Sequence, residues 1–208
     1  MKLIFCIILC LYCNFTYGQK QDIQKVEEKI ETLITKTRGY INIYNIVSLI
    51  SWDSHIIHYI PSVPPYEPQD YRNITISSSF GNRRHPITQE YKHHTGIDLP
   101  MQLNDTVCAT ANGTIEVVGK DSKLGNYIKI AHKYGFKTIY GHLSKNIACV
   151  GDSVNIGQPI GLSGNTGLST GPHLHYSIQK NGLYENPYNY CFLYYNYLKN
   201  KHSITTLQ

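Results

Sequence analysis

Two histidines, His173 and His175, lie two residues apart in the segment GPHLHYSIQ near the carboxyl end of the chain. Residues two apart on a β-strand point to the same face of the sheet. Leu174, Tyr176 and Ile178 alternate with the histidines, so the pattern predicts a strand with one apolar face and one histidine-bearing face. Two imidazoles on one face can bind a metal ion or transfer protons near neutral pH.

A second pair of candidate ligands, His94 and Asp98, lies upstream in HTGID. The spacing would also suit an ion pair on a helix. Gly96 and the nearby Pro100 disfavour a helix and indicate a turn that runs into a strand. Two histidines and one aspartate would suit a tetrahedral zinc ion that keeps one position for water. The cysteines lack the spacing of a structural zinc site.

A further histidine, His142, follows an alternating run in YGHLS. By itself it could be an ordinary surface histidine at the end of a strand. The chain has no HExxH motif, so no glutamate base lies between two zinc-binding histidines on a helix. His142, together with whichever of His173 and His175 does not bind metal, is therefore the candidate for general base and general acid.

Several segments resemble, in their order and spacing, the lysostaphin/LytM-type zinc metalloendopeptidases over residues 70–190. They are FGNRRHPIT at 80–88, HTGIDLP at 94–100, ANGTI at 111–115, YGHLS at 140–144, GDSVNIGQPIGLSGNTGLSTGPHLH at 151–175 and NGLYENP at 181–187. The resemblance implies that His94, Asp98 and His175 bind one zinc ion. It implies that His142 and His173 act in catalysis.

The same resemblance implies an enzyme that hydrolyses peptide stems or cross-links of bacterial peptidoglycan, and we expect a metal-activated water to carry out this hydrolysis. The alternative is a non-catalytic wall-binding module, or an activator of other wall hydrolases. One departure from the family is the segment Pro100–Asp105, which replaces the usual run of small residues after the aspartate. Another is His93, which could compete with His94, although the spacing to Asp98 favours His94.

Residues 1–18 predict a signal peptide with cleavage near Gly18, because Lys2 precedes a short apolar run. We therefore expect export to the periplasm, the cell envelope or the medium. The apolar run is short for a membrane span, so membrane association is expected only if the leader stays uncleaved. The net charge of +5 suits an anionic wall polymer, and by itself it would equally suit nucleic acid or an ordinary soluble surface. The sequence has no basic stripe or aromatic-basic motif that would support nucleic-acid binding.

Residues 19–60 predict a helical N-terminal segment, because apolar residues recur at spacings of three and four over Asp22–Arg38. The part from Ile41 to Ile60 could be a second helix or an interfacial segment. The prolines of IPSVPPYEP predict an extended connector over 61–69. The catalytic domain is then expected over 70–192, with a C-terminal tail over 193–208.

The expected fold is mainly β, an antiparallel-sheet LytM-like domain preceded by a short helical segment. The antiparallel sheet follows from short β-rich runs at 106–111, 114–118, 127–131, 137–141 and 173–179, separated by glycine and asparagine. The LytM-like form of the domain is what the family resemblance implies. The glycine-rich segment Gly161–Gly171 lacks the GK[ST] of a phosphate-binding loop and predicts a turn that presents His173. After the leader three cysteines remain, so at most one disulfide can form within the chain.

Overall fold

The computed structural model describes residues 21–50, 54–67, 74–84 and 90–205, with side chains as far as Lys199. The predicted signal peptide, residues 1–18, lies outside these ranges. Within them, no helix has both the length and the apolar character that crossing a membrane requires. Cys108, Cys149 and Cys191 are all free thiols.

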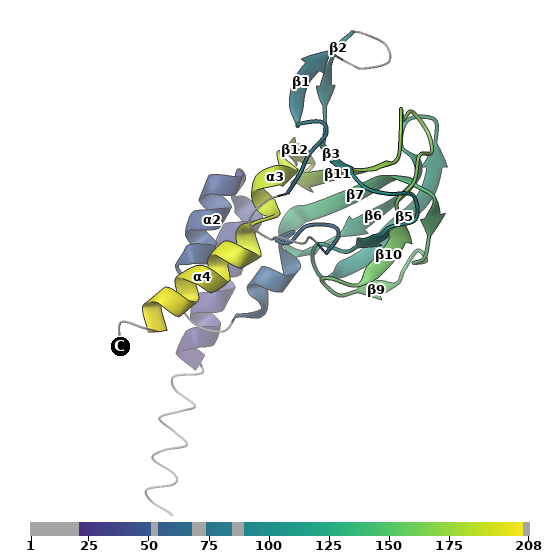
Figure 1. Ribbon diagram of the computed structural model, residues 1–208. Coiled ribbons are helices and arrows are strands. Elements are labelled where there is room, and N and C mark those ends of the chain that lie inside the picture. The colour runs from purple at the N-terminus through teal and green to yellow at the C-terminus, as the bar shows by residue number, and fades with distance from the viewer. Residues whose placement is uncertain (1–20, 51–53, 68–73, 85–89, 206–208) are drawn as a thin grey trace, which may run out of the picture.

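Antiparallel sheets make up most of the molecule, which confirms the predicted fold class (Figure 1). A seven-stranded sheet has the order β12-β11-β7-β6-β5-β9, with β3 paired to β11, and a three-stranded sheet has the order β4-β10-β8. Strands β1 and β2 form a separate hairpin that projects from the body. The strands are β1 Gly81–Arg84, β2 Tyr91–His94, β3 Ile97–Pro100, β4 Thr106–Cys108, β5 Gly113–Asp121, β6 Gly125–Ala131, β7 Phe136–Leu143, β8 Lys145–Asn146, β9 Ser153–Val154, β10 Pro159–Leu162, β11 His173–Lys180 and β12 Leu183–Glu185.

Helices from both ends of the chain lie together beside the sheets (Figure 1). Residues 21–36 are helical, as the apolar spacing predicted. The segment from Ile41 to Ile60, whose structure the sequence left open, contains a helix and a short 3-10 helix in its described part. The C-terminal helix was not predicted. The remaining helices are α2 Tyr40–Ser48, the 3-10 helices His55–Tyr59 and Lys133–Gly135, α3 Pro187–Tyr190 and α4 Leu193–Thr205.

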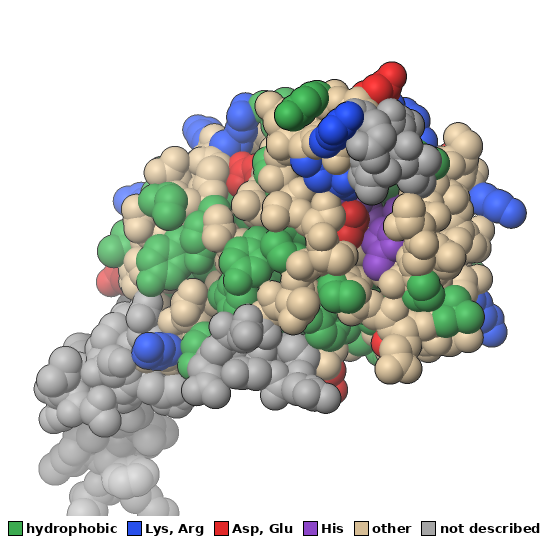
Figure 2. Space-filling view, turned by 45° about the horizontal axis from the view of Figure 1, so that its top comes forward, with side chains coloured by type: hydrophobic (Ala, Val, Ile, Leu, Met, Phe, Trp, Pro, Cys, Tyr) green, Lys and Arg blue, Asp and Glu red, His purple; other side chains and the backbone are tan. Residues whose placement is uncertain are grey.

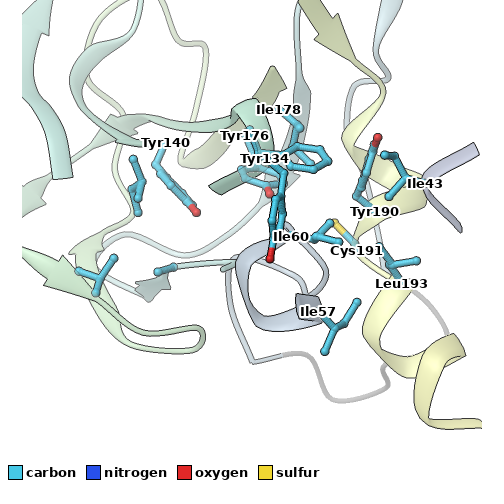
Figure 3. Packing of buried hydrophobic residues seen from close by; sticks show 14 of the residues in the cluster. Ile43, Ile57, Ile60, Tyr134, Tyr140, Tyr176, Ile178, Tyr190, Cys191 and Leu193 are labelled. Carbon is cyan, nitrogen blue, oxygen red and sulfur yellow. The ribbon is translucent and has the colours of Figure 1, made fainter. Parts of the chain in front are cut away.

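One hydrophobic core joins the helices to the sheets. Ile34 of the first helix and Ile43 of α2 are fully buried in the same cluster as Tyr176 of β11. Figure 3 shows Ile43, Tyr176 and Leu193 of α4 among the side chains of this cluster. A segment as small as residues 21–50 cannot bury a large core alone, so its apolar face is covered by the sheet domain.

Polar contacts fix the end of the first helix to strand β11. The ammonium group of Lys180, a fully buried residue, donates to the carbonyl oxygen of Thr35 at 3.0 Å and to that of Tyr134. The amide of Asn181 donates to the same Thr35 oxygen at 3.0 Å. Because the last carbonyls of a helix lack partners within it, and a cation is favourable there, Lys180 stabilises this helix end.

The proline-rich segment packs against the sheet domain along its described length. Pro61, Ser62, Pro64 and Pro65 are buried. The N–H of Ser62 donates to the carbonyl of Thr110 at 3.1 Å, and the Pro65 carbonyl accepts from Cys108 N–H at 2.8 Å. These bonds satisfy backbone groups that would otherwise be buried without partners. The described part of the predicted extended connector, residues 61–67, therefore packs on the sheet domain.

The shared core predicts that the N-terminal helices and the sheets unfold together. Ile34→Ala should lower the free energy of unfolding by about 2–5 kcal/mol, because it removes a side chain with no exposed surface from this cluster. The neighbouring Leu33, which is 52% exposed, gives a matched control, and Leu33→Ala should change stability by less than about 0.5 kcal/mol. Urea unfolding followed by circular dichroism measures both. Loss of helix in Ile34→Ala before the sheet signal changes would contradict a common core.

Candidate active site

A cavity of about 500 Å³ lies at the base of the β1–β2 hairpin. Its other walls come from residues 121–124, which join β5 to β6, and from residues 168–170. Figure 2 looks onto this face and shows histidine side chains within a hollow. No described residue of the N-terminal helices lines the cavity.

Strand pairing brings the predicted site residues to this cavity. β11 pairs with β3 on one edge and with β7 on the other, so His175 lies between Asp98 and Gly141. His142 follows Gly141 on β7, and His94 is the last residue of β2. The cavity is lined by every predicted site residue, namely His94, Asp98, His142, His173 and His175.

Three donor atoms converge on one point. His94 Nε2 lies 3.1 Å from His175 Nδ1 and 3.2 Å from Asp98 Oδ1, and His175 Nδ1 lies 3.0 Å from the same oxygen. Bonds of about 2.0–2.1 Å to a tetrahedral zinc ion imply distances of about 3.3–3.4 Å between ligand atoms. The triangle is therefore close to the size that zinc requires. In the part of the chain that the structure describes, this is the one such group of three metal-binding side chains.

Hydrogen bonds behind the two imidazoles suit the tautomers that a metal ion would require. His94 Nδ1 lies 2.9 Å from the carbonyl oxygen of Ser79, which can only accept, so the proton is on Nδ1. His175 Nε2 lies 2.8 Å from the hydroxyl of Ser177, which can accept its proton. In these tautomers the two nitrogens would present lone pairs to an ion beside the Asp98 carboxylate, so the residues present fit a metal ion. Without an ion, the same nitrogens can donate to Asp98 Oδ1.

Asp98 is held in its ionised form. Burial raises its pKa, but hydrogen bonds from His175 and His94 outweigh burial and hold the pKa well below its usual value. Its second oxygen, Oδ2, accepts from Arg83 Nη2 at 3.4 Å. Arg83 thereby occupies Oδ2 and leaves Oδ1 to face the two histidines. The sequence analysis included Arg83 in a matching segment but gave it no role.

His142 and His173 form a second pair beside the three donor atoms, with ring centroids 4.5 Å apart. The Nδ1 atom of each ring lies 2.8 Å from a carbonyl oxygen, that of Thr166 for His142 and that of Gly171 for His173. Both rings therefore carry their proton on Nδ1 when neutral, and Nε2 can accept a proton. Burial lowers the pKa of His142 to about 4, so this ring is neutral at pH 7.

The backbone at His142 is held in an unusual conformation. Its φ is +62°, in the left-handed region that side chains disfavour. Its N–H donates to the carbonyl of Leu124 at 2.6 Å. The Thr166 hydroxyl, next to the carbonyl that holds His142 Nδ1, donates to the Leu143 carbonyl at 2.9 Å and accepts from Asn126 N–H at 3.0 Å. Thr166 thus ties the segment before β11 to strands β6 and β7, a role with no sequence signal beyond the glycine-rich turn.

Gly96 allows the chain to pass close to β11 between His94 and Asp98. A Cβ atom at this position would lie 2.4 Å from the carbonyl oxygen of Tyr176 and 2.9 Å from the His175 ring. The predicted turn into a strand is confirmed, with β3 starting at Ile97. His93 lies outside the group of donor atoms, because its Nδ1 lies 2.9 Å from Asn82 Oδ1 and its ring packs on Phe80.

Comparison with known proteins gives consistent matches. A model of peptidase family M23 matches residues 92–187. Peptidoglycan DD-endopeptidase ShyC of Vibrio cholerae is 39% identical over 121 residues, which are 58% of this chain and 28% of that protein. The chain spans only 25% to 36% of the length of the first curated relatives that it matches.

Solved structures share the fold. A zinc-containing peptidase from Vibrio cholerae has a TM-score of 0.54 at 35% identity, over 61% of this chain and 39% of that chain. The catalytic domain of the antimicrobial peptidase lysostaphin from Staphylococcus simulans has a TM-score of 0.53 at 32% identity, over 61% of this chain and 98% of that chain. Since the lysostaphin domain is covered almost in full and the family model spans the site, the chain belongs to peptidase family M23, as its resemblance to lysostaphin/LytM-type enzymes predicted.

Proposed function

We propose that this chain is an exported zinc metalloendopeptidase that hydrolyses peptide bonds in the stems or cross-links of bacterial peptidoglycan. The observation that carries the proposal is the convergence of His94 Nε2, Asp98 Oδ1 and His175 Nδ1, at 3.0–3.2 Å from one another, beside a second pair of histidines. The names of relatives support peptidoglycan as the substrate, since ShyC is a peptidoglycan DD-endopeptidase. Action on that polymer would place the protein in the periplasm, the cell envelope or the medium.

The proposed ligands would hold one zinc ion. When bound, zinc supplies a Lewis acid for the peptide carbonyl and lowers the pKa of a water molecule toward neutrality. Three protein ligands leave a position open for that chemistry, as catalytic zinc sites do. Arg83 keeps Asp98 oriented through Oδ2, and the Ser79 carbonyl and Ser177 hydroxyl keep the two imidazoles oriented.

His142 and His173 would carry the proton transfers. Each ring has its Nδ1 hydrogen-bonded to a backbone carbonyl, so Nε2 is the nitrogen that exchanges protons with reactants. The low pKa of His142 keeps this ring in the form that accepts a proton at pH 7. With two such rings in contact, one accepts a proton from the attacking water while the other stabilises the oxyanion or protonates the leaving amine.

Substitutions should distinguish the proposed zinc ligands from the proposed catalytic residues. His94→Ala, Asp98→Ala and His175→Ala should each lose bound zinc, whereas His142→Ala and His173→Ala should keep zinc and lose at least about a hundredfold in hydrolysis. Elemental analysis of the purified protein measures zinc. Mass spectrometry of fragments released from purified peptidoglycan measures new peptide termini. Release of all zinc by His142→Ala or His173→Ala, or full activity of Asp98→Ala, would disprove these roles.

His93 gives a matched control for that experiment. His93→Ala removes the imidazole next to His94 without touching the donor atoms, so zinc content should be unchanged. His93 also lines the cavity, so this variant is a control for zinc binding and not for activity. The wild-type result also decides between enzyme and binding module. A folded, zinc-loaded protein that releases no fragments from several wall types would favour a wall-binding or activating module instead.

Thr166 should affect the rate of hydrolysis and not the binding of zinc. Thr166→Val keeps the shape but removes the hydroxyl that joins Leu143 and Asn126, so we expect kcat to fall about tenfold through misplacement of the His142 ring. Thr166→Ser keeps the hydroxyl and should stay within a few-fold of wild type. Steady-state kinetics on muropeptides and zinc analysis test this together. Equal losses in both variants, or loss of zinc from Thr166→Val, would contradict a positioning role.

Export is testable through the N-terminus of the protein made in bacteria. If residues 1–18 are a signal peptide, the protein in the envelope or medium should begin near Gln19. N-terminal sequencing of that fraction measures the cleavage point. A protein that retains Met1 in the membrane fraction would show instead that the leader serves as an anchor.

A further inference from the structure

Cationic side chains line two parts of the catalytic cavity. Arg83 of β1 and Lys92 of β2 belong to the hairpin wall, and Lys123 belongs to the turn between β5 and β6. The proposed metal ligands and catalytic histidines line the same cavity. In Figure 2, Lys and Arg side chains are gathered next to the hollow that contains the histidines. A substrate that reaches the histidines is therefore exposed to positive charge.

The acidic residues near these cations do not cancel them. Asp121, which also lines the cavity, uses Oδ1 to accept the backbone N–H groups of Lys123 and Leu124 at 2.8 and 2.7 Å. Within the described ranges, the ammonium of Lys123 has no ion pair. Lys92 pairs with Glu90 at 2.8 Å, but both side chains are more than half exposed, so the pair is weak and open to exchange.

Arg83 offers a further unused donor. Its Nη2 contacts Asp98, while Nε is buried and has no hydrogen-bond partner among the described residues. A buried donor without a partner costs free energy, so a bound acceptor would be favoured there. A guanidinium presents its donors in a fork that matches the two oxygens of a carboxylate.

We propose that this site selects peptides that carry a free carboxylate close to the bond to be cleaved, held by the cations of the two walls. The inference rests on the proposed function and specifies its substrate. Amidation of such a carboxylate removes the charge while changing the shape little. The site should therefore discriminate between free and amidated stems by charge, with the lysines as specificity-determining residues.

The size of the effect follows from the exposure of the lysines. A contact between exposed charges changes affinity by about two- to fivefold, so loss of both lysines should change it by about fivefold or more. The contribution should appear in KM and not in kcat, because the charges do not touch the reacting atoms. It should shrink in about 1 M salt, where the screening length falls to about 3 Å.

The experiment compares two forms of one substrate. Cross-linked muropeptide dimers are used with their carboxyl groups either free or amidated, and kcat and KM are measured with the zinc-loaded full chain. Lys92→Gln, Lys123→Gln and the double variant remove charge from one wall or both. Lys145→Gln, an exposed lysine of β8 outside the cavity, is the matched control.

The proposal requires wild type to prefer the free form by about fivefold or more in kcat/KM, with this preference unchanged in Lys145→Gln and lost in the double variant. Equal cleavage of both forms by wild type would overturn the inference and leave the peptidase function in place. A preference that survives in the double variant would also overturn it, because the lysines would not be its source. Cleavage of neither form would instead contradict the proposed function, and the inference would fail with it.

Discussion

The pairing of β11 with β3 on one edge and β7 on the other is the constraint on which the site depends. The register places His175 directly between Asp98 and Gly141, so one strand sets the position of a proposed ligand relative to its partner and relative to the His142 backbone. A shift of one residue in this pairing would turn His173 and His175 to the opposite face of the sheet. The buried apolar residues Leu174, Tyr176 and Ile178 oppose such a shift, because their side chains would then leave the core.

The same strand connects the site to the helices at the far end of the sheet. His173 and His175 occupy the start of β11, and Lys180 at its end holds the carbonyl of Thr35. Burying a lysine is costly unless its donors are satisfied, and here two carbonyls satisfy them. The N-terminal helices therefore act on the site indirectly. They line no part of the cavity in the described structure, and their contacts stabilise the strand that carries the histidines.

The sequence predicted those strands and turns whose residue pattern lies within one short segment of the chain. Alternation of apolar and polar residues identified the strands that became β4, β5, β6, β7 and β11, and a glycine between His94 and Asp98 indicated the turn that the structure contains. The five site residues were named because two short histidine motifs and the family resemblance point to them, and the fold brings them together. Their division into ligands and catalytic residues stays a prediction. The fold class is confirmed by the antiparallel sheets.

What the sequence did not predict depends on contacts between distant residues. Arg83 matters because a hairpin places its guanidinium 3.4 Å from Asp98, and nothing in the spacing of the two residues states this. Thr166 matters because its hydroxyl lies between Asn126 and Leu143, which belong to two other strands. Residues 193–208, which contain helix α4, were expected as a C-terminal tail. Helix α4 is fixed by buried Leu193 and Tyr197, which fill the core beside α2. In each case the position of a side chain is set by a contact that forms only in the folded protein. Residues that orient the site are therefore harder to predict from sequence than the proposed ligands and catalytic residues.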